Sequence, residues 1–384
     1  MSRSTYFVTC VPGTERELFR EVKALGFSKS ESQVAGVRFE GTRKDAWRAN
    51  LSLRTAIRVL ERLTRFEAPD EDALYAGAKA IEWERWLAPD GTLAVDARSK
   101  DSALFHTRFL QQLVKDAVCD RLRERSGTRP SVDPASPDLR IDLHLFKDRA
   151  TLSLDTSGDP LYKRGWRRHQ GRAPLAENLA AALVLRSGWD HRSPVVDPFC
   201  GSGTILVEAG LIASGRLPGA MGRRFGFERF GDHDAKAYER VLEGARAEGK
   251  PTRKLTLVGL DREPERIEQA RENLAAAGIE ARIQLEEGDA RTWMPKAGWN
   301  AWIVTNPPYG ARVRSDGNVD VLYTAFARRL AEYAGGYHVT MISSVTQGLD
   351  ALPLVGASRS AILNGGLECE VISGEVPRHA PSAD

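Results

Sequence analysis

Residues 1–160 consist of short segments in which apolar positions recur either every two residues or about every 3.6 residues. A period of two predicts strands, here at residues 5–9, 34–40, 57–66, 92–97, 139–146 and 150–155. The longer period predicts helices at residues 14–25, 44–51, 70–80 and 105–125, the first with Thr14 as its cap and Glu17 three residues on. The last two strands flank a polar turn and predict a hairpin. This mixture of small units predicts an α+β fold for the N-terminal part of the chain.

The pattern changes from Pro174 onward, where short apolar runs alternate with helical segments. After a first helix at 175–186, the runs predict strands at residues 195–196, 255–260, 281–285, 301–305 and 338–342. Strands that alternate with helices are typical of a doubly wound parallel sheet, so we expect an α/β fold here. A long insertion at residues 215–251 separates the first two strands, and it contains a helix at 234–247 and an aromatic run at 225–230.

The composition is that of an ordinary folded protein, with 384 residues, 42% of them apolar and 28% charged. The apolar stretches fall well short of the ~18 residues that suggest a membrane span. The N-terminus lacks the apolar segment of a secretory signal. The four cysteines and seven histidines show no metal-ligand spacing. We therefore expect no metal, free thiols, a cytoplasmic location and a monomer.

The formal net charge of +3 excludes a uniformly basic protein, although residues 1–170 carry 30 basic and 25 acidic side chains against 25 and 27 in residues 171–384. A basic segment joins the two parts, and Tyr162 and Trp166 lie within it. Cations interleaved with aromatic rings suit RNA phosphates and bases, whereas a solvated hinge is the alternative interpretation. The candidate RNA contacts are Lys163, Arg164, Arg167 and Arg168.

The strongest chemical signal is the run Asp197-Pro198-Phe199-Cys200-Gly201-Ser202-Gly203-Thr204, which follows a predicted strand and opens a helix. Its glycines allow a sharp turn and a close approach to a ligand, and the helix start offers unpaired N–H groups. The third glycine of a dinucleotide fingerprint is absent, because Leu206 stands there, and the chain has no GxxxxGK[ST] motif. Both observations weigh against a dinucleotide or ATP site.

Acidic residues follow the next two predicted strands. Asp261, in Gly259-Leu260-Asp261, can accept hydrogen bonds from ribose hydroxyls, and Asp289 can accept one from an adenine amino group. A single acidic residue at a strand end is usually a cap or turn residue. Ligands bind at the carboxyl edge of parallel strands, so several such residues together indicate a site. We expect Arg262 and Ala290, which follow the two acids, to line it as well.

The run Asn306-Pro307-Pro308-Tyr309-Gly310 follows the strand expected at 301–305 and indicates the chemistry. Two prolines restrict the loop, and the Asn306 carbonyl oxygen is an acceptor. With the Pro307 carbonyl it can hold a substrate NH₂ group by both hydrogens. Pro308 completes the rigid turn, and Tyr309 offers a flat face for a planar amide or base. An ordinary proline-rich turn is the alternative interpretation.

These two runs resemble class I S-adenosylmethionine-dependent methyltransferases that modify exocyclic amino groups. More narrowly, the chain resembles the bacterial THUMP-domain methyltransferases of the RlmL type, which make N2-methylguanosine in 23S ribosomal RNA. Supporting stretches are Leu161-Tyr162-Lys163-Arg164-Gly165-Trp166-Arg167, Ala173-Pro174-Leu175-Ala176-Glu177-Asn178-Leu179-Ala180, Phe225-Gly226-Phe227-Glu228 and Asn364-Gly365-Gly366-Leu367-Glu368-Cys369. The resemblance covers nearly the whole chain and is most specific at residues 160–312.

The resemblance implies a ferredoxin-like subdomain at residues 1–60, a THUMP RNA-binding domain at 61–156, a basic linker at 157–173 and a Rossmann-like methyltransferase domain at 174–384. It implies S-adenosylmethionine over Asp197, Gly201 and Gly203, with the ribose at Asp261 and the adenine near Asp289. This chain departs from the family in two ways. Phe199 stands where the family usually has Met, and no room remains for the second methyltransferase domain that some members carry.

Methyl transfer from a sulfonium needs alignment of the acceptor nitrogen and exclusion of water more than acid–base chemistry. Asn306 and the Pro307 carbonyl would favour the positive charge that develops on guanine N2, and the base would leave its stack to reach Tyr309. No general base is assigned. Ribosomal RNA is the favoured substrate. The alternatives are a guanosine of transfer RNA, adenine N6, a glutamine amide, and an inactive RNA-binding assembly factor.

Overall fold

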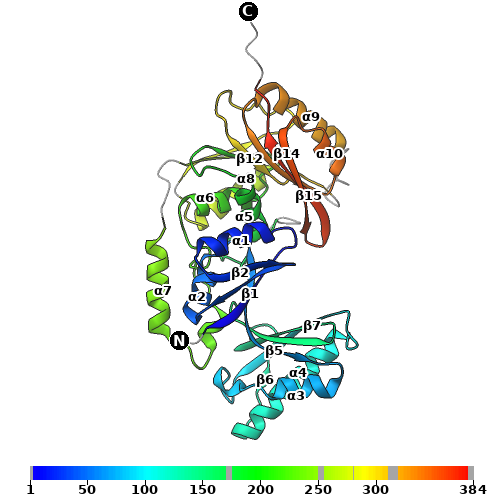
Figure 1. Ribbon diagram of the computed structural model, residues 1–384. Helices are drawn as coiled ribbons and strands as arrows, with labels where there is room; N and C mark the ends of the chain where they lie inside the picture. The colour runs from blue at the N-terminus through cyan, green and yellow to red at the C-terminus, as the bar shows by residue number, and fades with distance from the viewer. Residues whose placement is uncertain (1–2, 170–174, 250–254, 280, 310–318, 379–384) are drawn as a thin grey trace, which may run out of the picture.

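The computed structural model describes residues 3–169, 175–249, 255–279, 281–309 and 319–378. An eight-stranded sheet forms the N-terminal part of these residues and a seven-stranded sheet the C-terminal part (Figure 1). Among the described residues, no helix combines the length and the apolar character that a membrane crossing requires.

The N-terminal sheet has the strand order β2-β3-β1-β4-β8-β7-β5-β6. The strands are Ser4–Cys10 (β1), Ser28–Gln33 (β2), Gly36–Gly41 (β3), Ala56–Glu67 (β4), Thr92–Lys100 (β5), Ser131–Val132 (β6), Leu139–Phe146 (β7) and Arg149–Asp155 (β8). The expected hairpin is confirmed as β7 and β8. The strand expected at 34–40 begins later, because Ala35, with φ 57°, lies in the turn between β2 and β3. Strand β4 pairs with both β1 and β8, so one sheet runs through the whole N-terminal part.

The helices of the N-terminal part pack on one face of this sheet. They are α1 (Glu15–Ala24), α2 (Arg43–Ser52), α3 (Glu71–Lys79) and α4 (Thr107–Ser126), with a 3-10 turn at Trp83–Arg85. Each predicted helix is confirmed within two residues at either end. The capping role expected of Glu17 is wrong, because its carboxylate pairs with Arg186 of the C-terminal part (2.5 Å).

The C-terminal sheet has the order β11-β10-β9-β12-β13-β15-β14. Its strands are Val195–Asp197 (β9), Thr256–Asp261 (β10), Arg282–Glu287 (β11), Trp302–Thr305 (β12), His338–Ser343 (β13), Val355–Asn364 (β14) and Leu367–Glu375 (β15). Strands β9 to β13 are parallel, which confirms the doubly wound sheet. The sequence analysis missed the antiparallel hairpin β14–β15 at one edge, whose exposed residues carry little apolar pattern.

The helices of the C-terminal part are α5 (Glu177–Arg186), α6 (Thr204–Ala213), α7 (Ala235–Ala247), α8 (Pro264–Ala276), α9 (Val319–Tyr333) and α10 (Thr346–Asp350), with a 3-10 turn at Gly226–Arg229. Helices α5, α6 and α7 were predicted, and α9 and α10 were not. In Figure 1 the C-terminal sheet and its helices lie above the N-terminal sheet, and α7 lies at the left beside α2.

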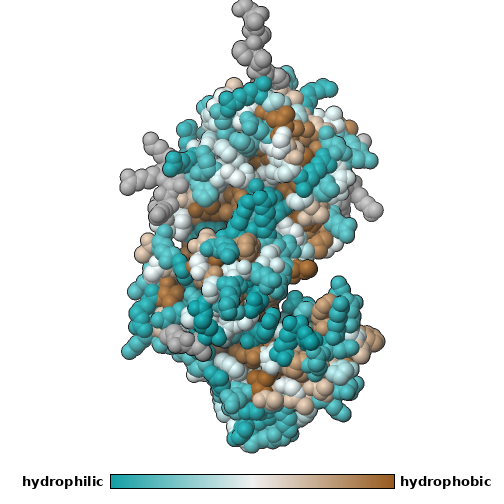
Figure 2. All heavy atoms as spheres, viewed as in Figure 1, coloured by the Kyte–Doolittle hydropathy of each residue, from teal (hydrophilic) through white to brown (hydrophobic). Residues whose placement is uncertain are grey.

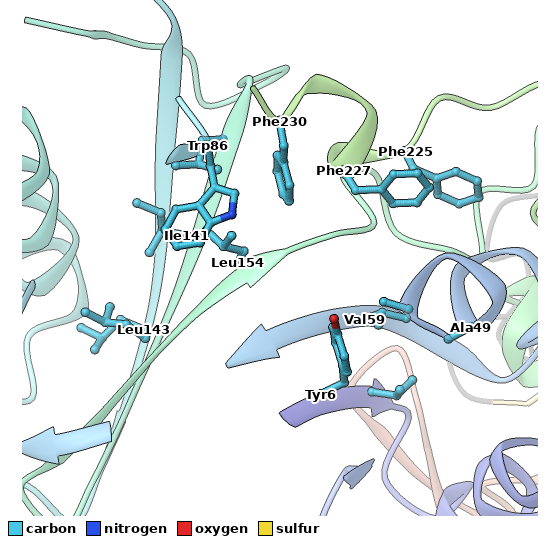
Figure 3. Close-up of a cluster of buried hydrophobic side chains, with 14 of the residues drawn as sticks. Tyr6, Ala49, Val59, Trp86, Ile141, Leu143, Leu154, Phe225, Phe227 and Phe230 are labelled. Carbon is cyan, nitrogen blue, oxygen red and sulfur yellow. The ribbon is translucent and has the colours of Figure 1, made fainter. Parts of the chain in front are cut away.

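The insertion that contains α7 packs against the N-terminal part rather than against its own sheet. Phe225, Phe227 and Phe230 belong to the core formed by β1, β4 and β7 (Figure 3). The Phe227 backbone N–H donates to the Thr156 carbonyl (3.0 Å), and the Gly231 N–H donates to the Trp86 carbonyl (2.9 Å). The expected aromatic run therefore joins the two parts of the chain.

Candidate active site

The predicted glycine-rich run forms the connection between β9 and α6. The strand order reverses between β9 and β12, and in doubly wound sheets the crevice at the carboxyl ends of such neighbouring strands receives the ligand. Gly201 and Gly203 have φ values of 52° and 79°, which glycine adopts without strain. A Cβ at Gly201 would meet nothing within 4 Å, so this side of the turn is open. Pro198, Cys200, Ser202 and Thr204 are buried beneath the turn.

Asp197 lies at the end of β9 and is 1% exposed. Its Oδ1 atom accepts hydrogen bonds from the Thr305 hydroxyl (2.6 Å) and the Phe199 N–H (3.2 Å). Burial raises the pKa of Asp197 to about 7, and the negative charge of Asp261 acts in the same direction, while the two hydrogen bonds lower the pKa. The carboxyl group therefore titrates near neutral pH, and a nearby positive charge would favour its ionised form.

Asp261 lies at the end of β10 and faces the glycine turn. One carboxylate oxygen accepts from the Gly201 N–H (2.9 Å), and the other accepts from the Glu263 N–H (3.0 Å). These bonds fix the carboxylate while each oxygen keeps a second lone pair for a ligand hydroxyl. Burial raises the pKa of Asp261 above its ordinary value, although these backbone bonds oppose that effect. Arg262 follows it with an exposed side chain.

Asp289 follows β11, one strand further from the reversal point. Its carboxylate pairs with Arg291 through Nε (2.9 Å) and Nη2. This hydrogen-bonded pairing lowers the pKa of Asp289, so the group is a stable anion. Ala290 is buried beside it and belongs to the apolar core under β9 and β10. A contact of Asp289 with an amino group would have to share the carboxylate with Arg291.

Asn306 directly follows β12, next to the connection after β9. Its carbonyl oxygen Oδ1 is buried and has no hydrogen-bond partner among the described residues. An unpaired buried acceptor costs about 1–3 kcal/mol, so such groups call for an explanation. A ligand N–H group would satisfy this oxygen.

The two prolines and Tyr309 hold the loop after Asn306 in place. Pro307 is buried, and the Pro308 carbonyl accepts from the Tyr323 hydroxyl of α9 (3.3 Å). Tyr309 is 5% exposed, and its hydroxyl accepts from the Asn364 side-chain N–H at the end of β14 (2.6 Å). A base can stack on Tyr309 only if side chains around the ring move, so stacking stays a prediction. Gly310 lies outside the described residues.

Three residues that the sequence analysis did not name as site residues also shape this region. Asn273 of α8 donates to the Ser202 carbonyl (2.9 Å) and accepts from the Arg168 backbone N–H (2.8 Å), which ties the glycine turn to the basic segment. Asn178 of α5 is 1% exposed with no partner for its amide among the described residues. Asn364 acts on Tyr309 from 55 residues away, a pairing that no local pattern predicts.

The basic segment does not present all of its cations to solvent. Arg164 is 1% exposed and pairs with Glu208 of α6 (3.2 Å), and Arg167 pairs with Glu177 of α5 (2.8 Å). The RNA-contact role expected of Arg164 and Arg167 is therefore wrong for this structure, because both guanidinium groups are held inside the protein. Lys163 and Arg168 are exposed. Residues 170–173 of the expected linker lie outside the described residues.

The chemistry of these residues fits S-adenosylmethionine. An open glycine turn at a helix start suits close approach of a ligand backbone, and the fixed Asp261 carboxylate suits two ribose hydroxyls. The titratable Asp197 suits a cationic ligand. The Asn306 oxygen next to the turn, to which no described residue donates, suits the amino group of a methyl acceptor. Among the described residues, no group of three metal-ligating side chains is present.

Comparison with known proteins relates the whole chain to methyltransferases. The THUMP domain model matches residues 68–155, and the RlmL ferredoxin-like domain model matches residues 5–60. The chain is 38% identical over 380 residues to ribosomal RNA large subunit methyltransferase K/L of Syntrophotalea carbinolica, covering 97% of this chain and 53% of that protein. It is 37% identical over 375 residues to the same-named protein of Pseudomonas paraeruginosa, covering 95% of this chain and 52% of that protein.

The chain thus spans about half the length of the curated relatives it matches. Among solved structures, SMU.472 complexed with SAH superposes with a TM-score of 0.88 at 28% identity, over 99% of this chain and 100% of that chain. The model described as the RMKL-like methyltransferase domain matches residues 164–371, which is more than half of the chain. The protein therefore belongs to the RMKL-like methyltransferase domain family, with a THUMP domain and an RlmL ferredoxin-like domain before it.

Proposed function

We propose that this chain transfers a methyl group from S-adenosylmethionine to the exocyclic N2 of a guanosine in 23S ribosomal RNA. The observation that carries the proposal is the buried Oδ1 of Asn306 beside the glycine turn, which has no partner in the described part of the chain. An acceptor in that position selects a substrate that brings an N–H group. The THUMP match and the names of the curated relatives support RNA as the substrate.

The chain's own residues have a limited task in this reaction. S-adenosylmethionine supplies a methyl group that is already activated as a sulfonium. Asn306 Oδ1 and the Pro307 carbonyl would accept the two N2 hydrogens and so orient the nitrogen lone pair. The same acceptors favour the positive charge that develops on nitrogen. The proton then leaves to solvent, and no general base is assigned, because residues 306–310 include no histidine, lysine or carboxylate.

The direct test is a tritiated-methyl transfer assay with protein-free 23S ribosomal RNA that lacks modifications. We expect transfer to RNA, and nucleoside analysis of the product should give N2-methylguanosine. Transfer RNA and polyadenylate are the matched control substrates. N6-methyladenosine as the product, or label on a glutamine of a protein, would replace the proposal by one of the alternatives.

An absence of both methyl transfer and donor binding by calorimetry would assign the chain to inactive RNA-binding factors. Intact Asp197, Gly201, Gly203, Asp261 and Asn306 argue against that outcome. The assignment of these side chains, with Arg262, Asp289 and Ala290, to the donor site remains part of the proposal. The proposal also includes the division of the chain at residues 60, 156 and 173 and a monomeric state. It further includes a cytoplasmic location, because ribosomal RNA is found there.

The affinity for the donor should depend on pH through Asp197. The folded pKa of about 7 lies above the ordinary value of 3.8, so ionisation of Asp197 costs stability as the pH rises from about 4 to 7. A sulfonium nearby would favour the ionised form and bind more tightly once Asp197 is charged. We expect the ratio of the dissociation constants of S-adenosylhomocysteine and S-adenosylmethionine to rise up to about tenfold between pH 6 and pH 8.

Calorimetric titration with both ligands at each pH measures this ratio directly. S-adenosylhomocysteine has the same amino acid and nucleoside groups without the sulfonium charge. The titration of groups that contact these shared parts therefore cancels in the ratio of the two dissociation constants. The Asp197→Asn variant keeps an acceptor for Thr305 and should give a ratio that is independent of pH. A pH-dependent ratio in this variant would assign the titration to another group.

A further inference from the structure

The N-terminal sheet has one face that the helices leave uncovered. In β7 the odd-numbered residues from Leu139 to Leu145 are buried in the core under α4, so the even-numbered residues point to the other face. In Figure 1, α3 and α4 lie on the side of β5 and β7 away from the rest of the molecule. Figure 2 shows a notch in the outline between these strands and the body above them.

The strand register places two rows of side chains side by side on this open face. The first row crosses the strands β5, β7, β8 and β4 and consists of Arg98, His144, Thr151 and Arg65. The second row lies next to it and consists of Lys100, Phe146, Arg149 and Glu67. Neighbouring strands are about 4.8 Å apart, so each row is a continuous strip of side chains. Together the rows carry four cations and one carboxylate.

Two of the four cations of this face, Arg65 and Lys100, are available to a ligand, whereas Arg149 pairs with Glu67 (2.5 Å). Within the described parts of the chain, neither Arg65 nor Lys100 has an ion-pair partner. Arg98 pairs with Asp142 (2.8 Å) but its side chain stays 59% exposed. Partial burial of the ring lowers the pKa of His144, the positive charges of Arg98 and Arg65 lower it further, and the negative charge of Asp142 opposes these effects. The lowered pKa favours the neutral form of the ring.

Two rings lie in the middle of these cations. The His144 imidazole and the Phe146 ring are parallel, with an interplanar angle of 3° and centroids 6.3 Å apart. His144 is exposed and Phe146 is half-buried. The Lys147 ammonium lies 5.4 Å from the Phe146 centroid. Neutral, parallel rings on a sheet face can stack on unpaired bases, while flanking cations hold the phosphates.

We propose that this face, defined by Arg65, Arg98, Lys100, His144 and Phe146, binds a single-stranded segment of RNA, which deepens the proposed function and rests on its RNA substrate. Arg65, Arg98 and Lys100 contact the phosphates, and the His144 and Phe146 rings stack on one or two bases. The RNA contacts expected of Arg164 and Arg167, whose guanidinium groups are held inside the protein, are assigned to this face instead. An acidic protein segment would need the cations but not the pair of rings.

The test measures binding of a fluorescein-labelled oligouridine by anisotropy as a function of salt. The Arg65→Gln/Arg98→Gln variant should bind about tenfold more weakly, and its slope of log K against log salt should fall by about 1.4, because each lost phosphate contact in single strands removes about 0.7. The matched control is Arg123→Gln/Arg125→Gln, which removes the same charge from the exposed surface of α4. We expect this control to bind like the unmodified chain.

The His144→Ala/Phe146→Ala variant tests the rings independently of the charges. It should bind oligouridine at least about tenfold more weakly with an unchanged salt slope. Circular dichroism of both variants should match that of the unmodified chain, which shows that the losses of binding do not come from unfolding. The proposal would be overturned if the α4 control lost as much affinity for oligouridine as the Arg65→Gln/Arg98→Gln variant. It would also be overturned if polyglutamate competed as well as RNA and the His144→Ala/Phe146→Ala variant bound oligouridine normally.

The two proposals can fail separately. Methyl transfer to 23S ribosomal RNA with unchanged oligouridine binding in both variants would retain the proposed function and reject this face. Loss of oligouridine binding in both variants of a chain that transfers no methyl group to any RNA would retain the face and reject the function.

Discussion

Replacement of Asn306 by alanine is expected to lower the rate of methyl transfer by about 10²–10³-fold, while the dissociation constant of S-adenosylmethionine changes by less than about twofold. The reason is that Oδ1 is a buried acceptor with no hydrogen-bond partner among the residues that the structure describes. Its role is to hold the acceptor nitrogen and to favour the charge that develops on it. In the folded chain the oxygen bonds to nothing that the structure describes, so its removal should not destabilise the protein.

Single-turnover kinetics with 23S ribosomal RNA and calorimetry with the donor give the two quantities. The Asn306→Asp variant keeps an oxygen acceptor at the same place and should retain more activity than Asn306→Ala. A structural role for Asn306 predicts the opposite pattern, with a lower melting temperature and weaker donor binding in the alanine variant. Turnover of the alanine variant within tenfold of the unmodified chain would contradict the assigned role.

The parts of the fold that local sequence patterns describe were predicted well. The glycine turn, the acids at the ends of β9 and β10 and the asparagine after β12 each follow a strand directly. Parallel strands bring their carboxyl ends to one edge, so these residues converge without any knowledge of the loops. The bonds from Thr305 to Asp197 and from Gly201 to Asp261 are consequences of the same arrangement.

Side chains that find a partner far along the chain could not be placed in this way. Arg164 has the local surroundings of a surface cation, with Lys163 before it and Arg167 and Arg168 after it. Its partner Glu208 lies within α6, whose other residues are almost all apolar. The sequence shows two charged residues 44 positions apart, and only the fold shows that both are buried.

The Arg164–Glu208 pair leads to the second large effect. Arg164 Nε and Nη2 donate to the Glu208 carboxylate (3.2 and 3.3 Å), Nη1 donates to the Leu161 carbonyl and Nη2 to the Arg54 carbonyl. Arg54 precedes β4 and Glu208 lies in α6, so the guanidinium connects the N-terminal part with the helix after the glycine turn. Removal of one partner would leave the other as an uncompensated buried charge.

The Glu208→Gln variant is therefore expected to lower the free energy of unfolding of the C-terminal part by about 3–5 kcal/mol. Urea unfolding followed by tryptophan fluorescence measures this change as a shift of the transition midpoint. The matched control is Glu124→Gln, which breaks the exposed ion pair with Lys79 (2.7 Å) and should cost less than about 1 kcal/mol.

A double variant separates the charge from the packing at this position. In Arg164→Met/Glu208→Leu both charges are absent, so the desolvation penalty of each disappears together with their attraction. We expect this variant to recover more than half of the stability that Glu208→Gln loses, the remainder being the unpaired Leu161 and Arg54 carbonyls. A double variant as unstable as Glu208→Gln would show that the pair acts through shape and hydrogen bonding. Recovery of the free energy of unfolding would show that each buried charge needs a partner of opposite charge from the other part of the chain.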